Sequence, residues 1–390
     1  IEALADNINE SVNLKVGLLV ESVEGAETIK SGQGGWRMLS NWMNVADEGR
    51  DYDLEMKRMT DQSQYMVALF QQSSFILMVA SGAMLIGGGG LTMGGLIACS
   101  ILSGRILAPV AQIPSHLVQW ANTKAAIRSL DAIWDLKCDH DDIEQPIVPE
   151  NLRGEFSIEA QTQFNYTEKA ALSLPEMKIK PGEKIAILGP IGSGKTTLLR
   201  LLSGMYKPNN GRIMLDDVDL AHISKPVLSE KIGFLQQEGR LFKGTLRENL
   251  ILGLVDPGDD KILETAKKTG LLDSVISSNE KGLEQEIFEG GMGLSGGQKQ
   301  LVNLTRVVLR SPKIWLLDEP TASVDKNLER LLIDLFKKIL TPQETFIVVT
   351  HKMEMLELVD RLIVVNKNQV IMNGPKAEVI AQLSGGEKQQ

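Results

Sequence analysis

Charged positions divide the chain into segments of different character. Residues 62–104 contain no Asp, Glu, Lys or Arg, whereas charged residues make up 23% of the whole chain. Four glycines at 87–90 interrupt this stretch and predict a turn between two helices. Helices over residues 65–87 and 92–114 would each be long enough to cross a hydrocarbon core of about 30 Å. The pattern predicts a transmembrane helical hairpin.

The residues alone also allow a second interpretation, a hairpin buried inside a large soluble domain. The polar run at residues 71–74 (QQSS) favours it, while the length of the segment and its lack of charge favour the membrane. Basic residues stand on both outer flanks, at 57–58 and at 124 and 128. Because cytoplasmic flanks are rich in Lys and Arg, we expect both flanks to lie in the cytoplasm.

Arg105 lies inside the second predicted span. An arginine there either faces a polar pathway or a partner, or reaches the membrane interface with its long side chain. Both interpretations stay open. Two spans do not enclose a pathway alone, and the sequence begins at Ile1 rather than at a Met. We therefore expect an incomplete chain whose pathway is completed by upstream helices or a second chain.

Helical patterns flank the predicted hairpin. Residues 1–60 carry apolar positions at helical spacing, with glycines concentrated at 32–35, and residues 115–136 are again helical in pattern. The acidic segment 137–152, with two prolines, is typical of a linker. We therefore expect residues 1–136 to form a helical domain and 137–152 to connect it to a second domain.

A short amphipathic segment comes directly after the glycines of residues 32–35. Trp36, Leu39 and Met43 share one helical face, and Trp42 adds a second indole. A surface helix facing its own core explains such a stripe. A docking helix also explains it, because two tryptophans supply a large aromatic contact.

From about residue 153 to residue 382, short apolar runs alternate with helical segments. The runs are Lys184–Leu188, Ile213–Leu215, Ile314–Leu317, Thr345–Val349 and Leu362–Val365. This alternation predicts an α/β domain with a largely parallel sheet.

Residues 189–196 (GPIGSGKT) fit the phosphate-binding pattern G-x-x-x-x-G-K-[ST]. The motif follows an apolar strand and precedes a leucine-rich helix, so backbone N–H groups and the helix N-terminus can surround phosphate oxygens. Lys195 is expected to reach the β- and γ-phosphates and Thr196 to bind Mg²⁺. The predicted nucleotide-binding residues here are Gly189, Pro190, Ile191, Gly192, Ser193, Gly194, Lys195, Thr196 and Thr197.

Two further motifs complete the predicted site. Asp318 and Glu319 end an apolar strand; with the phosphate loop present, we expect Asp318 to bind Mg²⁺ and Glu319 to orient or activate water. Alone, such a pair is more often a solvated strand end. Residues 294–298 (LSGGQ) open a helix and predict a second anion-binding terminus. Two chains facing head to tail would use both termini, each closing over the other's γ-phosphate.

Together these motifs, in this order, resemble the nucleotide-binding domain of ATP-binding-cassette (ABC) proteins. The resemblance implies that Tyr166 stacks on adenine, that Gln237 links Mg²⁺ to the membrane domain, with neighbouring Gln236 as the alternative register, and that His351 contacts the γ-phosphate. Taken alone, His351 would more often be structural. It further implies that Ser295, Gly296, Gly297, Gln298 and Asp325 contact the ATP of a partner chain. The catalytic residues expected are Glu319, His351 and Lys195, and the Mg²⁺ ligands Thr196, Gln237 and Asp318.

The order of helices, spans, linker and ATPase resembles the last part of an ABC exporter half, most of all bacterial type I secretion and bacteriocin-export transporters. The resemblance implies an α/β P-loop ATPase behind a helical transmembrane segment, with Trp36, Leu39, Trp42 and Met43 in the coupling helix. It implies ATP-driven export of a polypeptide from a multi-pass protein of the cell inner membrane, with the ATPase in the cytoplasm. A homodimer, membrane lipid and a periplasmic adaptor are the expected partners.

Two alternatives remain, a lipid or drug exporter and a soluble ABC ATPase of DNA repair or translation. The formal net charge of −9 argues against general affinity for nucleic acid, and two cysteines, Cys99 and Cys138, suggest a reducing compartment. A second LSGG at residues 383–386 is followed by only four residues, and we expect 383–390 to be a flexible tail.

Overall fold

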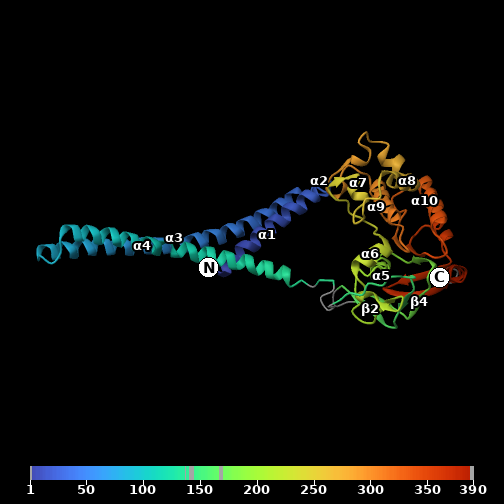
Figure 1. The fold of residues 1–390 in the computed structure, drawn as a ribbon, viewed down its shortest axis with the longest axis horizontal. Helices are drawn as coiled ribbons and strands as arrows, with labels where there is room; N and C mark the ends of the chain where they lie inside the picture. Colours follow the sequence, from blue (N-terminus) through green and yellow to red (C-terminus); the bar gives the residue numbers. More distant parts are fainter. Residues whose placement is uncertain (1, 137, 140–144, 167–169, 387–390) are drawn as a thin grey trace. The chain divides into compact units, whose positions relative to one another are not determined.

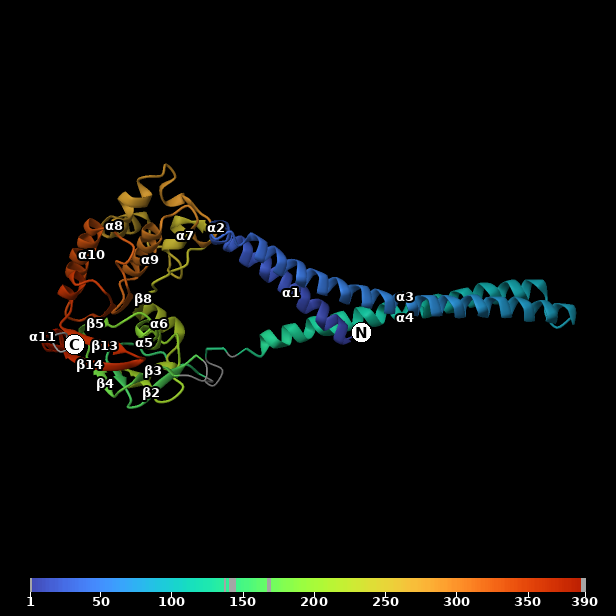
Figure 2. The same cartoon turned by 180° about the vertical axis from the view of Figure 1, so that it is seen from behind.

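The computed structural model describes residues 2–136, 138–139, 145–166 and 170–386 (Figures 1 and 2). The chain divides into two compact units, Ile1–Cys138 and Asp139–Gln390. Among the described residues, the first unit has a small hydrophobic core and the second has two large clusters.

The first unit is helical in its described part. Its helices are α1 (Glu2–Glu24), α2 (Ala26–Ser31), α3 (Gly35–Gly87) and α4 (Met93–Trp134). α1 packs against α3 and α4, and α3 packs along α4. Gly49 and Gly82 allow these close approaches, because a Cβ at Gly49 would clash with Ser11 and one at Gly82 with Leu96.

The helices on either side of the glycine turn are longer than the predicted spans. α3 begins before the docking segment and ends at Gly87, and α4 runs on without a break to Trp134. Residues 36–43 are therefore the first turns of α3 and not a short helix of their own, which corrects our expectation. The separate short helix between α1 and α3 is α2 (Ala26–Ser31).

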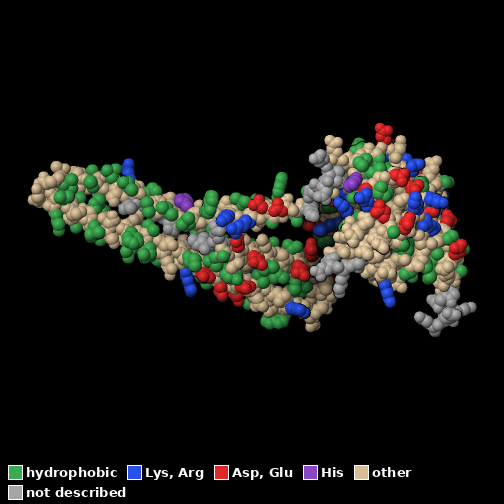
Figure 3. Space-filling model, turned by 90° about the horizontal axis from the view of Figure 1, so that it is seen from below, with side chains coloured by type: hydrophobic (Ala, Val, Ile, Leu, Met, Phe, Trp, Pro, Cys, Tyr) green, Lys and Arg blue, Asp and Glu red, His purple; other side chains and the backbone are tan. Residues whose placement is uncertain are grey.

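Both long helices are apolar enough and long enough to cross a membrane by length and composition. Their most apolar 18-residue windows are 6% buried in α3 and 0% buried in α4. Figure 3 shows hydrophobic side chains over the end where α3 meets α4, with charged side chains gathered toward the opposite end of this unit. Arg105 lies on α4 with an exposed side chain. A buried core hairpin would hide such windows, so this exposure favours the membrane interpretation.

The described residues of the second unit form three sheets. Its strands are β1 (Phe156–Ile158), β2 (Thr162–Asn165), β3 (Ala170–Leu174), β4 (Met177–Ile179), β5 (Lys184–Leu188), β6 (Ile213–Leu215), β7 (Val218–Asp219), β8 (Ile232–Leu235), β9 (Gly244–Thr245), β10 (Glu286–Ile287), β11 (Ile314–Asp318), β12 (Thr345–Val349), β13 (Arg361–Asn366) and β14 (Gln369–Pro375). Its helices are α5 (Lys195–Leu202), α6 (Lys225–Lys231), α7 (Leu246–Leu250), α8 (Asp259–Thr269), α9 (Gly296–Arg310), α10 (Lys326–Ile339) and α11 (Lys376–Gly386).

The main sheet has the order β2-β3-β14-β13-β5-β12-β11-β8. From β13 to β8 every pairing is parallel, whereas β2–β3 and β13–β14 are antiparallel. This arrangement confirms the α/β class and the central parallel strands. The expectation for Ile213–Leu215 was wrong in one respect: β6 belongs to a separate antiparallel sheet of order β4-β1-β6-β7. A three-residue apolar run does not reveal which sheet it joins.

Alternate side chains of the parallel strands enter two different cores. Leu317 and Val348 join the cluster under α8, α9 and α10, while Leu316 and Ile347 join the cluster under α5 and α6. Strands buried on both faces become continuous apolar runs, which is why the sequence revealed them.

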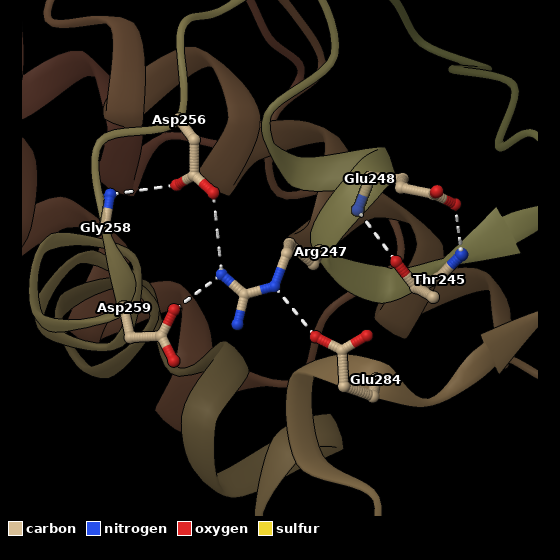
Figure 4. A network of polar contacts seen from close by, with 7 residues as sticks. All are labelled: Thr245, Arg247, Glu248, Asp256, Gly258, Asp259 and Glu284. Carbon is tan, nitrogen blue, oxygen red and sulfur yellow. Dashed lines mark hydrogen bonds and ion pairs between the residues drawn. The ribbon is translucent and has the colours of Figure 1, made fainter.

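Arg247 is the centre of an ion-pair network beside α7 (Figure 4). Its guanidinium lies 2.5 Å from Asp259 Oδ1 at the start of α8, 2.8 Å from Glu284 Oε1 and 3.9 Å from Asp256 Oδ2. The hydrogen bonds to Asp259 and Glu284 raise the pKa of Arg247. The hydrogen bond from Arg247 in turn lowers the pKa of Asp259. This network ties α7 to the loop before α8.

At the C-terminus, α11 extends to Gly386. Residues 383–386 are therefore helical rather than a flexible tail, which corrects our expectation for them. Residues 387–390 lie outside the described part of the chain.

Candidate nucleotide-binding site

The predicted phosphate loop joins the central strand β5 to α5. Gly189 has a φ of +153° and Gly194 a φ of +102°. A Cβ at Gly189 would clash with the carbonyl oxygen of Val365, and one at Gly194 would lie 3.0 Å from Leu172 Cδ1. These positions need glycine, so the loop conformation is built into the sequence.

Inside the loop, Lys195 bonds to main-chain oxygens. Its Nζ donates to the carbonyl oxygens of Gly189, at 2.8 Å, and Pro190, at 2.9 Å, and the residue is only 7% exposed. Burial lowers the pKa of Lys195, while Glu319 and Asp318 oppose that effect. Ser193 Oγ is also buried and, among the described residues, has no hydrogen-bond partner. A buried cation and an unpaired hydroxyl in a glycine loop suit an anion such as phosphate.

The side chains of Thr196, in the first turn of α5, and Asp318, at the end of β11, are in contact. Thr196 Oγ1 donates a hydrogen bond of 2.7 Å to Asp318 Oδ2. Asp318 ends the fully buried strand β11 and is 1% exposed, and burial raises the pKa of its carboxyl group. A hydroxyl and a carboxylate are oxygen donors of the kind Mg²⁺ prefers, so this pair fits the predicted metal ligands.

Glu319 follows with an unusual backbone, a φ of +48°. Its carboxylate lies 3.4 Å from His351 Nε2 and accepts a hydrogen bond of 3.5 Å from Gln237 Nε2. Gln236, the alternative register, instead donates to Met205 Sδ. The predicted residues Lys195, Thr196, Asp318, Glu319, Gln237 and His351 thus come from four separated segments and gather at the ends of neighbouring parallel strands.

Tyr166 lies near the same helix from another direction. Its hydroxyl is 3.3 Å from Thr197 Oγ1 on α5, and its ring packs edge-on against Phe164 and Tyr206. The residue is half exposed, so part of its side chain is accessible for an aromatic contact. Ile191 stands at the tip of the loop with its side chain 96% exposed.

The second predicted set stands at helix N-termini. Ser295 caps α9 in a reciprocal pair of hydrogen bonds with Gln298, and Asp325 caps α10 by accepting from the N–H groups of Asn327 and Leu328. Gly296 and Gly297 form the first turn of α9. Within the described residues, no hydrogen bond or ion pair connects Ser295 or Asp325 to residues 189–196. Both views show α9 with α7, α8 and α10, apart from α5 (Figures 1 and 2).

Sequence reasoning missed two residues that hold the turn after β11. Gln300 donates to the main-chain oxygen of Glu319 and accepts from the N–H of Ser323. Lys352, beside His351, donates to the oxygen of Thr321 and pairs with buried Glu329 at 3.1 Å. A single glutamine within a helix gives no sequence signal of such contacts. For Lys352, its position next to His351 was the one sequence feature that could have indicated a role near the site.

Part of the chain is similar to proteins of known families. Residues 172–322 match the family model described as ABC transporter. The chain is 29% identical to the leukotoxin translocation ATP-binding protein LktB of Mannheimia glucosida over 374 residues, and to that of Bibersteinia trehalosi over 371 residues. Each match covers 94% of this chain and 51% of the relative, so the chain spans about half the length of these relatives.

Among solved structures, the fold is similar to "Structure of a bacterial Atm1-family ABC exporter with ATP bound", with a TM-score of 0.86. The sequence identity is 22%, and the alignment covers 97% of this chain and 66% of that one. This likeness extends over both units and shows their folds.

Proposed function

We propose that this chain, whose residues 172–322 match the ABC transporter family model, hydrolyses ATP and uses the reaction to export a polypeptide across a membrane. One observation carries the ATPase part: Lys195, Asp318 and Glu319 converge beside one glycine loop, with Thr196, Gln237 and His351 completing the group.

In this proposal the phosphate oxygens of ATP replace the two carbonyl oxygens as hydrogen-bond partners of Lys195. The hydroxyl of Ser193 also donates to a phosphate oxygen. Glu319 holds a water molecule and accepts its proton as the water oxygen bonds to the γ-phosphorus. The bond from that phosphorus to the β–γ bridging oxygen breaks, and ADP leaves. Thr196, Asp318 and Gln237 would hold Mg²⁺, which neutralises charge on the phosphates when bound. His351 contacts the γ-phosphate, and Tyr166 stacks on adenine.

A second chain completes each site. Within the described residues, no hydrogen bond joins the phosphate loop to residues 295–298 at the start of α9 or to Asp325 of the same chain. This separation supports a head-to-tail homodimer. In it, each α9 terminus faces the γ-phosphate bound to the other chain.

The helical unit is proposed as the membrane part. Exposed apolar windows of α3 and α4 support spans over residues 65–87 and 92–114, with lipid around them and the ATPase on the cytoplasmic face of an inner membrane. The connection from α1 through α2 to Trp36, Leu39, Trp42 and Met43 exposes two indoles, which supports a coupling role.

The name of the similar relatives, leukotoxin translocation ATP-binding protein, supports polypeptide cargo. A periplasmic adaptor is proposed as a further partner. The test is ATP hydrolysis by the protein in lipid vesicles, with added polypeptide, lipid or drug. We expect polypeptide alone to accelerate hydrolysis. Acceleration of hydrolysis by lipid or drug alone would favour a lipid or drug exporter instead. In a separate test, recovery of the protein in the supernatant after membrane pelleting would overturn the membrane assignment.

A further inference from the structure

We propose that Gln300 is a positioning residue for the hydrolytic glutamate, Glu319. Its amide joins α9 to both ends of the turn formed by residues 319–323. This inference rests on the proposed ATP hydrolysis and adds a residue that acts on it through Glu319.

The contacts of Gln300 use both ends of its amide. Nε2 donates a hydrogen bond of 2.6 Å to the main-chain oxygen of Glu319, and Oε1 accepts one of 3.0 Å from the N–H of Ser323. The residue is 8% exposed, so water does not compete for these groups. A buried amide with its donor and acceptor both satisfied by one turn fixes that turn relative to the helix.

Glu319 needs such support, because its φ of +48° lies in the left-handed region that non-glycine residues rarely adopt. Its N–H donates to Val349 on β12, and its oxygen accepts from Ala322 within the same turn. Among the described residues, Gln300 is the only side chain that hydrogen-bonds to the main chain of Glu319. A peptide rotation there would turn the carboxylate away from Gln237 and His351.

A second contact joins the same two segments. Gly297, in the first turn of α9, packs directly under Ser323, where a Cβ would lie 2.6 Å from the carbonyl oxygen of Ser323. The side chain of Gln300 accepts a hydrogen bond from the N–H of Ser323, and the missing side chain of Gly297 leaves room for the carbonyl oxygen of Ser323. The start of α9 and the turn after β11 are therefore held in register, and a displacement of α9 would shift the backbone of Glu319 with it.

The test compares Gln300→Met, which removes both hydrogen bonds at similar volume, with Gln300→Glu, which keeps the acceptor for Ser323 but loses the donor to Glu319. We expect both variants of the full chain to lower kcat for ATP about 10-fold while KM for ATP changes less than about 2-fold. Thr305→Val is the matched control, because Thr305 is fully buried on the same helix and its hydroxyl bonds to Thr269 and Leu301 instead.

A double-mutant cycle separates positioning from loosening of the fold. If Gln300 acts through Glu319, Gln300→Met should change the residual single-turnover rate of a Glu319→Gln protein by less than about 2-fold. An equal fall in both backgrounds, an equal fall in kcat for Thr305→Val, or unchanged kcat in both Gln300 variants would overturn the inference. Absence of hydrolysis by the wild-type chain would instead overturn the proposed function.

Discussion

Thr196 and Asp318, which stand 122 positions apart in the chain, share a hydrogen bond of 2.7 Å. This bond joins the first turn of α5 to the end of β11. The hydroxyl and carboxylate oxygens, both suited to bind a metal ion, therefore lie side by side. The carboxylate of Asp318 is almost fully buried, and this burial opposes its charged form.

Asp318→Asn should therefore stabilise the nucleotide-free protein while abolishing Mg²⁺-dependent hydrolysis. The folded protein holds the proton of Asp318 more tightly than the unfolded chain, so stability falls as pH rises from the unfolded pKa through the raised folded pKa. The asparagine variant lacks this loss and should be more stable than the wild-type protein at neutral pH. Denaturant unfolding with EDTA at several pH values measures the gain, which should shrink toward acid pH; a constant difference would contradict the explanation.

Glu319→Gln should abolish turnover and leave ATP binding intact. The amide keeps the size of the side chain and its place beside Gln237 and His351, but it accepts no proton from water. Steady-state hydrolysis should fall at least about 100-fold, and ATP should trap a dimer on size-exclusion chromatography. Glu378→Gln, a change at an exposed position at the start of α11, is the matched control. Turnover near the wild-type rate would show that Glu319 is not the base.

Ser295→Arg should block hydrolysis at the site of the partner chain, because it places a bulky cation at the α9 terminus. Ser295→Thr keeps an oxygen for the cap of α9 and should retain most activity. Loss of the cap alone would cost about 1 kcal/mol of stability, so melting temperatures are compared as well.

A mixing experiment tests whether the site is shared. In a heterodimer of one Ser295→Arg chain and one Glu319→Gln chain, both lesions fall in the same composite site, and the other site is intact. Two inactive proteins should therefore regain hydrolysis when they are unfolded, mixed and refolded, or co-expressed. No recovery in verified heterodimers would contradict a site built from two chains.

Arg247→Gln should destabilise the region of α7 and α8, because it leaves three carboxylates without their shared cation. The pKa of Asp259 is lowered in the folded state, so its stabilising contact is present above the unfolded pKa and is lost as pH falls through the folded value. The difference in melting temperature between wild type and variant should therefore be largest near neutral pH and smallest in acid. Lys268→Gln, which breaks a single exposed pair with Glu264, should change little.

The sequence by itself determined which residues form the candidate site and much of the framework that holds them. Parallel strands buried on both faces must be apolar throughout, so β5, β11, β12 and β13 were visible as runs, and the loop glycines at 189 and 194 specify a backbone that other residues resist. The charge-free stretch likewise marked two helices able to cross a membrane.

Only the tertiary structure decided which side chains share a contact. It placed Gln237 rather than Gln236 against Glu319, moved Ile213–Leu215 into an antiparallel sheet, and joined Gln300 to a turn about twenty residues away. It also assigned the short helix to α2 and not to residues 36–43. Local spacing encodes backbone conformation and one-sided burial, whereas these contacts depend on how distant segments pack, which no local pattern specifies.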